Sequence, residues 1–93
     1  MLASNSPMVV SIIINNYNYA RYLRSAIDSA LAQTYDAVEV IVVDDGSTDD
    51  SQAVIQAYGD SIMPLYQRNM GQAAAFNLGF ACSTGDVIIF LDA

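Results

Sequence analysis

The chain contains no lysine and no histidine, and its only cationic side chains are Arg21, Arg24 and Arg68. Ten acidic residues outnumber them, so the formal net charge is -7. Nucleic-acid binding depends on cationic contacts to phosphate, and this balance therefore argues against DNA or RNA as a partner. A phosphorylated ligand would have to rely on the arginines, on backbone amides and on a divalent cation. The acidity is equally compatible with a role in solubility alone.

Cysteine and long apolar runs are also scarce. A single cysteine, Cys82, leaves no partner for an internal disulfide and makes a reducing compartment the default. No apolar run approaches the roughly 18–20 residues that cross a bilayer. Residues 1–7 lack the features of a signal peptide, and we expect them to form a flexible leader. These observations favour a cytoplasmic protein, or one at the cytoplasmic face of the membrane in its full-length form.

What the chain does contain is enough apolar sequence for one folded domain. The hydrophobic content of 54% excludes intrinsic disorder. Three apolar runs, residues 9–15, 38–44 and 86–92, are rich in β-branched residues and nearly continuous, as is typical of strands covered on both faces. A weaker run, residues 62–67, contains Pro64. Proline cannot donate to a sheet ladder, so we place this third strand at the edge.

Three helices are expected between these strands. Apolar residues at helical spacing form a stripe over residues 23–31. Ser47 lies three residues before Asp50, an acidic variant of a capping box that predicts a helix running to Ala57. Residues 71–83 form the third helix. The resulting β-α-β-α-β-α-β order predicts an α/β fold, a parallel sheet with right-handed crossovers and helices on both faces.

Ligands of such sheets bind beyond the carboxyl ends of the strands, where this chain places polar residues. Asn15 and Tyr17 follow the first strand. Two explanations account for these residues. They can form a turn, or the asparagine amide and the tyrosine ring can bind a nucleobase. Asp44 and Asp45 follow the second strand. Capping needs only one of these adjacent carboxylates, so one is available to accept the imide N–H of a uracil-like base.

The third and fourth strands lead to Gly71 and Asp92. Gly71 allows the backbone to approach a ligand and opens a helix whose free amides favour phosphate, although a simple turn glycine is equally common. Asp92 ends a buried apolar strand, where a carboxylate needs a partner such as a metal or a ribose hydroxyl. These positions indicate a ligand site at one edge of the sheet.

Several other classes of α/β protein fit less well. A NAD-binding domain would carry G-x-G-x-x-G after the first strand, where this chain has NNYNYA. A phospho-receiver domain would use a lysine, and the chain has none. A sugar nucleotidyltransferase-like domain would normally have a glycine-rich, basic first loop. That class and a non-catalytic nucleotide-binding module remain the alternatives.

Four motifs stand in register along the chain: VSIIINNYNYARYL, then SALAQTY followed by VEVIVVDDGSTDDS, then RNMGQAAAFNLGFACSTGD, and finally VIIFLDA. Together they resemble the family 2 glycosyltransferases of the GT-A fold. The resemblance implies a Rossmann-like half of that fold. It also implies the donor-binding part of an inverting glycosyltransferase, which moves a sugar from a nucleoside diphosphate sugar, expected to be UDP-linked, to an acceptor hydroxyl.

The resemblance also implies roles for individual residues. Asn15 and Tyr17 would contact the nucleobase, with the Tyr17 ring stacked on it. Asp45 would bond the base edge, while Asp44 would orient the loop or touch the nucleoside. Gln72, beside Gly71, would lie near the ribose or the diphosphate.

Asp92 matches the first acid of the family's Asp-x-Asp motif, which binds ribose and a bridging Mn²⁺ or Mg²⁺. Residues 8–93 are thus expected to be a nucleotide-sugar-binding subdomain truncated inside that motif, and inactive by itself, with no catalytic residue assigned. Many relatives carry arginine where Phe76 stands, which weakens direct phosphate pairing from that helix. The last strand, residues 87–91, would present an apolar edge, and we expect self-association through it.

Overall fold

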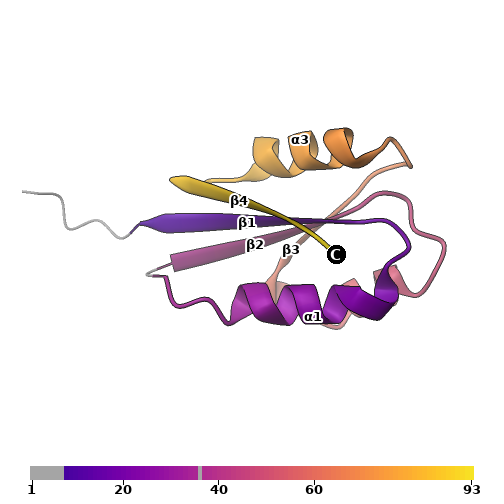
Figure 1. Cartoon of the computed structure of the whole chain (residues 1–93), viewed down its shortest axis with the longest axis horizontal. Helices are drawn as coiled ribbons and strands as arrows, with labels where there is room; N and C mark the ends of the chain where they lie inside the picture. The colour runs from indigo at the N-terminus through magenta and orange to yellow at the C-terminus, as the bar shows by residue number, and fades with distance from the viewer. Residues whose placement is uncertain (1–7, 36) are drawn as a thin grey trace, which may run out of the picture.

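The computed structural model describes residues 8–35 and 37–93, which form one four-stranded parallel sheet between layers of helices (Figure 1). The strands are β1 (Val9–Asn16), β2 (Ala37–Asp44), β3 (Met63–Tyr66) and β4 (Val87–Asp92). The helices are α1 (Ala20–Leu31), α2 (Ser51–Gln56) and α3 (Gln72–Cys82), with a short 3-10 turn, η1 (Gly59–Ser61). The predicted order and fold class are confirmed, while the expected leader, residues 1–7, lies outside the described residues.

The sheet order is β3-β2-β1-β4, so the first strand of the chain lies inside the sheet and β3, with Pro64, lies at an edge as predicted. In Figure 1, β4 from the end of the chain runs beside β1 from its beginning. Asn16 pairs in register with Asp44, and Asn15 with Asp92. The strand order reverses between β1 and β4. This register brings the carboxyl ends of three strands together at that reversal, the place where open α/β sheets bind ligands.

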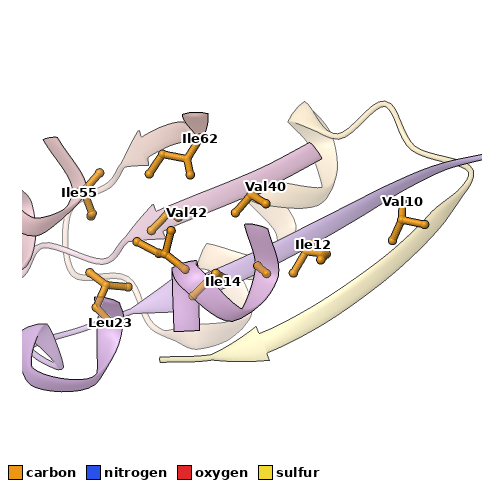
Figure 2. Packing of buried hydrophobic residues seen from close by; sticks show 10 residues of the cluster. Val10, Ile12, Ile14, Leu23, Val40, Val42, Ile55 and Ile62 are labelled. Atoms are coloured by element: carbon orange, nitrogen blue, oxygen red, sulfur yellow. The ribbon is translucent and has the colours of Figure 1, made fainter. Parts of the chain in front are cut away.

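The two faces of the sheet bury alternate residues of β1. Ile12 and Ile14 pack with residues of α1 and α2 in the larger cluster (Figure 2), whereas Ile13 belongs to a smaller cluster with Ala75 of α3. Figure 1 shows α1 and α3 on opposite sides of the sheet. Successive side chains of a strand point to opposite faces. The unbroken apolar runs of β1 and β2 therefore follow from burial on both sides.

Helix α3 approaches the sheet closely because it carries glycine at the contact. A Cβ atom added to Gly79 would lie 2.5 Å from Cγ2 of Ile13, which is fully buried. A side chain at this position would have to push the helix from the strand. Gly79 thus sets the distance between α3 and β1.

Helix α2 begins at Ser51, so the predicted capping box at Ser47 is wrong. The Ser47 hydroxyl donates to Oδ1 of Asp44 at 2.6 Å and accepts from the Asn18 N–H at 2.9 Å. Asp49 serves the helix start instead, where its Oδ1 accepts the Ser51 N–H at 2.9 Å. Ser47 therefore ties two loops together.

The edge of β4 is exposed, as expected from the sequence. The described residues include no strand on the far side of β4 from β1. Val87 and Phe90 remain 39% and 47% exposed, and the Phe90 ring meets Phe76 edge-on with centroids 4.8 Å apart. Self-association through this edge stays a prediction. Among residues 8–35 and 37–93, no helix combines the length and the apolar character that a bilayer crossing requires.

Candidate functional site

A cavity of about 440 Å³ opens at the carboxyl ends of the strands. Six of the seven residues singled out from the sequence line it, and Asp44 is the exception. The complete lining is Asn15, Tyr17, Tyr19, Asp45, Asn69, Gly71, Gln72, Asp92 and Ala93. Segments far apart in the chain thus meet at a single site.

The segment that ends β1 divides its side chains between the cavity and the loops. Asn15 and Tyr17 line the cavity, and Tyr17 is 41% exposed. Asn16 is buried and donates from Nδ2 to Oδ1 of Asp44 at 2.9 Å. Asn18 has φ +57°, and its Oδ1 accepts the Thr48 N–H at 2.7 Å. The turn interpretation therefore describes Asn18, while Asn15 and Tyr17 are available to a ligand.

Asp44 is fully buried and faces the loop that follows β2. Besides the Asn16 amide, it accepts the Ser47 N–H at 3.0 Å and the Ser47 hydroxyl at 2.6 Å. Of the two roles expected for it, these contacts correspond to orienting the loop. The structure does not bring Asp44 to the cavity.

Asp45 joins the loops after β2 and β3 while also lining the cavity. Its Oδ1 accepts the Met70 N–H and the Gln67 side-chain amide, both at 2.7 Å, and its Oδ2 accepts the Gly71 N–H at 3.0 Å. Burial of this carboxyl raises its pKa, but the three hydrogen bonds outweigh burial and hold the pKa below its usual value. Asp45 is therefore a carboxylate at neutral pH.

These contacts also engage Gly71, while the expectation that free amides of the following helix favour phosphate stays a prediction. Its own amide donates to Asp45 and is not free for phosphate. Gly71 has φ +97°, a conformation that residues with a Cβ rarely adopt, and it immediately precedes α3. The glycine thus shapes the cavity wall where the third loop turns into the helix.

Asp92, at the end of β4, is held through one of its two oxygens. Oδ1 accepts from Nε2 of Gln72 at 2.9 Å. With the Asn15 amide oriented to satisfy its hydrogen bonds, Oδ1 also accepts from Nδ2 of Asn15 at 2.6 Å. Oδ2 accepts no hydrogen bond from the described residues. Asn15 and Gln72 therefore orient this carboxylate and leave one oxygen available in the cavity.

The cavity lining carries two carboxylates, Asp45 and Asp92, and no cationic side chain. Arg68 follows β3 but is exposed and does not line the cavity. Within residues 8–35 and 37–93, no group of three potential ligands could hold a metal alone. Mg²⁺ is commonly held by one or two carboxylates together with substrate phosphates. The available oxygen of Asp92 fits a Mn²⁺ or Mg²⁺ ion of that kind, shared with a bound diphosphate.

Comparison with known families adds to this geometry. The sequence pattern of the family described as Glycosyl transferase family 2 matches residues 11–93, nearly the whole described chain. The chain belongs to this family. The cavity residues from Asn15 to Ala93 all lie within the matched range.

Relatives of this family 2 chain include uncharacterized glycosyltransferases. One from Nostoc sp. is 56% identical over 90 residues, which cover 92% of this chain and 28% of the relative. Another, YibD of Escherichia coli, is 36% identical over 92 residues, covering 96% of this chain and 27% of the relative. The chain therefore spans less than a third of the length of these curated relatives.

Solved structures of two glycosyltransferases share the fold. The mannosyltransferase PcManGT of Pyrobaculum calidifontis, in complex with GDP-Man and Mn²⁺, superposes with a TM-score of 0.84 at 25% identity. That match covers 95% of this chain and 28% of the other. Glucosyl-3-phosphoglycerate synthase of Mycobacterium tuberculosis, with Mn²⁺ and UDP, gives 0.76 at 26% identity, covering 91% and 33%. Since these two structures contain different nucleobases, the fold alone does not determine the base.

Two residues at or beside the cavity were not predicted from the sequence. Tyr19 lines the cavity although it lies beyond β1 and past the left-handed turn at Asn18, so the alternation of a strand does not indicate its orientation. Gln67 was assigned only to the third strand, although its amide contacts Asp45. No local pattern reveals that contact, because it joins residues 22 positions apart.

Proposed function

We propose that this chain is the donor-binding part of a glycosyltransferase that uses a nucleoside diphosphate sugar, UDP-linked, and transfers the sugar to an acceptor hydroxyl. One observation carries the proposal. A single cavity, in a chain of family 2, joins an exposed aromatic ring, a buried carboxylate with one acceptor position left, and a second carboxylate with an available oxygen. These groups match a base at one end of the ligand and a diphosphate with its cation at the other.

The base would occupy the part of the cavity lined by Tyr17 and Asp45. The exposed Tyr17 ring offers a flat apolar surface, and bases stack readily on aromatic side chains. Asp45 is ionised, so it accepts hydrogen bonds and donates none. An imide N–H is the complementary group on uracil. This pairing of ring and carboxylate favours a uridine nucleotide.

The diphosphate would lie toward Asp92, where a cation is needed because the cavity lining has no positive side chain. Asn15 and Gln72 would keep the Asp92 carboxylate in place through its Oδ1. When bound, Mn²⁺ or Mg²⁺ would act as a Lewis acid that offsets the charge of the leaving nucleoside diphosphate. The other carboxylate of the cavity, Asp45, is held by three protein donors.

Inverting transfer requires a carboxylate that deprotonates the acceptor hydroxyl. Neither carboxylate of the cavity is suited to this role, since Asp45 is committed to the loops and Asp92 to the cation. We therefore propose that the 93-residue chain binds the donor without transferring sugar. Its relatives are more than three times as long. The whole protein would supply the carboxylate that acts as general base and the site that binds the acceptor.

Titration calorimetry with UDP, in the presence and absence of Mn²⁺, tests the nucleotide assignment. We expect weak binding of UDP that strengthens when Mn²⁺ is added. Asp92→Asn keeps the size of the side chain but weakens its affinity for a cation, so most of the Mn²⁺ effect should disappear. A folded protein that binds no UDP under either condition would overturn the assignment. UDP binding that Mn²⁺ leaves unchanged would overturn the role of Asp92.

A further inference from the structure

The Asp45 carboxylate has little acceptor capacity left for a ligand. An ionised carboxylate offers about four lone-pair positions, two on each oxygen. The Met70 N–H and the Gln67 amide fill both positions of Oδ1, and the Gly71 N–H fills one of Oδ2. A ligand in the cavity therefore meets one remaining acceptor position.

Nucleobases differ in the number of donors that they present to such a position. Uracil presents one N–H, at N3, between two carbonyl oxygens. Guanine presents two neighbouring N–H donors, at N1 and N2, which together match both oxygens of a carboxylate. Donors that become buried without acceptors are costly. A carboxylate with one oxygen fully occupied therefore suits uracil better than guanine.

We propose that Gln67 is a specificity-determining residue that selects uracil-type bases over guanine by occupying Oδ1 of Asp45. The proposal rests on the proposed nucleotide-binding function and concerns which base that site accepts. Gln67 acts through Asp45 and need not touch the base.

Gln67 is the only side chain among the described residues that donates to Asp45. The other two donors are backbone amides, which substitution of a side chain does not remove. Gln67 is also well placed to hold its position. Its backbone N–H donates to the Asp44 carbonyl at 2.9 Å, and its Nε2 lies 3.5 Å from the Gly71 carbonyl oxygen. The identity of residue 67 thus decides whether Oδ1 is filled.

Calorimetric titration of the wild-type chain with Mn²⁺ and four nucleotides tests the base contact. UDP and 5-methyl-UDP keep the N3–H, 3-methyl-UDP lacks it, and GDP replaces the base. We expect 5-methyl-UDP to bind like UDP, and 3-methyl-UDP and GDP to bind at least about tenfold more weakly. Equal binding of UDP and 3-methyl-UDP, or of UDP and GDP, would overturn the proposal while leaving nucleotide binding in place.

The variant Gln67→Met keeps the length of the side chain and removes its donor. With one position of Oδ1 open, GDP should gain affinity relative to UDP, narrowing the ratio of their dissociation constants by about three- to tenfold. Gln56→Met, on the exposed surface of α2, is the matched control and should leave the ratio unchanged.

An unchanged ratio in folded Gln67→Met protein would refute the role of Gln67. If the variant does not fold, equal binding of UDP and 3-methyl-UDP, or of UDP and GDP, by the wild-type chain would still overturn the proposal. Failure of every nucleotide to bind would mean instead that the nucleotide-binding function is wrong.

Discussion

The carboxylates at the two ends of the sheet differ in how fully they are hydrogen-bonded. At the amino end, Glu39 of β2 accepts the Ser11 hydroxyl at 2.6 Å, the Thr84 N–H at 2.9 Å and the Thr84 hydroxyl at 3.1 Å. At the carboxyl end, Asp92 is held through Oδ1 alone and has Oδ2 available. Glu39 is bonded through both oxygens and ties β2 to the backbone before β4, whereas Asp92 keeps one oxygen open to a ligand.

Asp44 and Asp45 show the same difference over a single step of the chain. Asp44 is enclosed and serves only the loop, while Asp45 holds the third loop and still borders the cavity. Adjacent residues with the same side chain therefore contribute differently, because Asp44 points into the fold and Asp45 borders the cavity.

The largest effect should come from removing an enclosed carboxylate. Asp44→Ala leaves the amide of Asn16 and the N–H and hydroxyl of Ser47 without their acceptor, so we expect the free energy of unfolding to fall by about 2–4 kcal/mol. Urea denaturation followed by circular dichroism measures this. Asp92→Ala is the comparison, and its cost should stay below about 1 kcal/mol because the side chain is exposed. If both variants lose the same free energy of unfolding, Asp44 and Asp92 do not differ in their structural role.

Removing a hydrogen bond that orients Asp92 should weaken the binding of UDP with Mn²⁺ and leave the stability of the fold nearly unchanged. Gln72→Ala removes one donor to Oδ1 of Asp92, so the carboxylate is less well oriented toward a cation. We expect the gain in UDP affinity that Mn²⁺ provides to shrink by about three- to tenfold, with little change in the urea midpoint. Gln52→Ala, on the exposed side of α2, is the control. A Mn²⁺ effect identical to that of the wild type would show that Gln72 does not orient Asp92.

The stability that the hydrogen bonds of Glu39 provide at the amino end of the sheet should depend on pH. Burial raises the pKa of Glu39, but hydrogen bonds from Ser11 and Thr84 outweigh it and leave the pKa below its ordinary value of 4.5. The charged form is thus favoured by folding. Its contribution to stability is complete above pH 4.5 and is lost as the pH falls through the lower pKa of the folded state.

Glu39→Gln isolates this contribution from those of Asp45 and Asp49, whose pKa values are also lowered. The variant should be less stable than the wild type at pH 7. The difference in their free energies of unfolding should shrink as the pH falls below 4.5. Urea titrations between pH 7 and pH 3 give this difference directly. If this difference in the free energy of unfolding is constant across that range, Glu39 is not ionised in its hydrogen bonds with Ser11 and Thr84.

The smallest effect concerns the two edges of the sheet. The short β3 edge carries Pro64, which blocks pairing, whereas the β4 edge is longer and exposes Val87 and Phe90. We expect weak, concentration-dependent self-association through β4, visible in sedimentation velocity. Phe90→Lys should reduce it, and Met63→Lys on β3 should leave it unchanged. Wild-type protein that sediments as a monomer at every concentration would contradict this.

The apolar runs were sufficient to predict the sheet and the place of β3 at one edge. Burial on both faces explains the runs of β1 and β2, but the expectation that the last strand is covered in the same way is wrong, because β4 lies at the other edge and has no fully buried residue. The residues that follow these runs also predicted which side chains would gather at the cavity. They did not predict how those side chains are held. Ser47 was expected to cap a helix and instead joins Asp44 to Asn18, and Gln67 was not expected to reach Asp45. Such contacts depend on loops that meet only after the sheet forms.

The alternation along β1 makes the site sensitive to changes in chain length. Asn15 faces the cavity and Asn16 faces the buried loop because they occupy neighbouring places on a strand that is packed on both sides. Deleting one residue from the stretch 10–14 would exchange these orientations for every following residue. Isoleucines would still fill both layers of the core, so the sheet could persist. Asn16 would then take the place of Asn15 at the cavity, and the bulky Tyr17 would take the buried place of Asn16 beside Asp44. Length variation in this strand should therefore be far less tolerated than substitution.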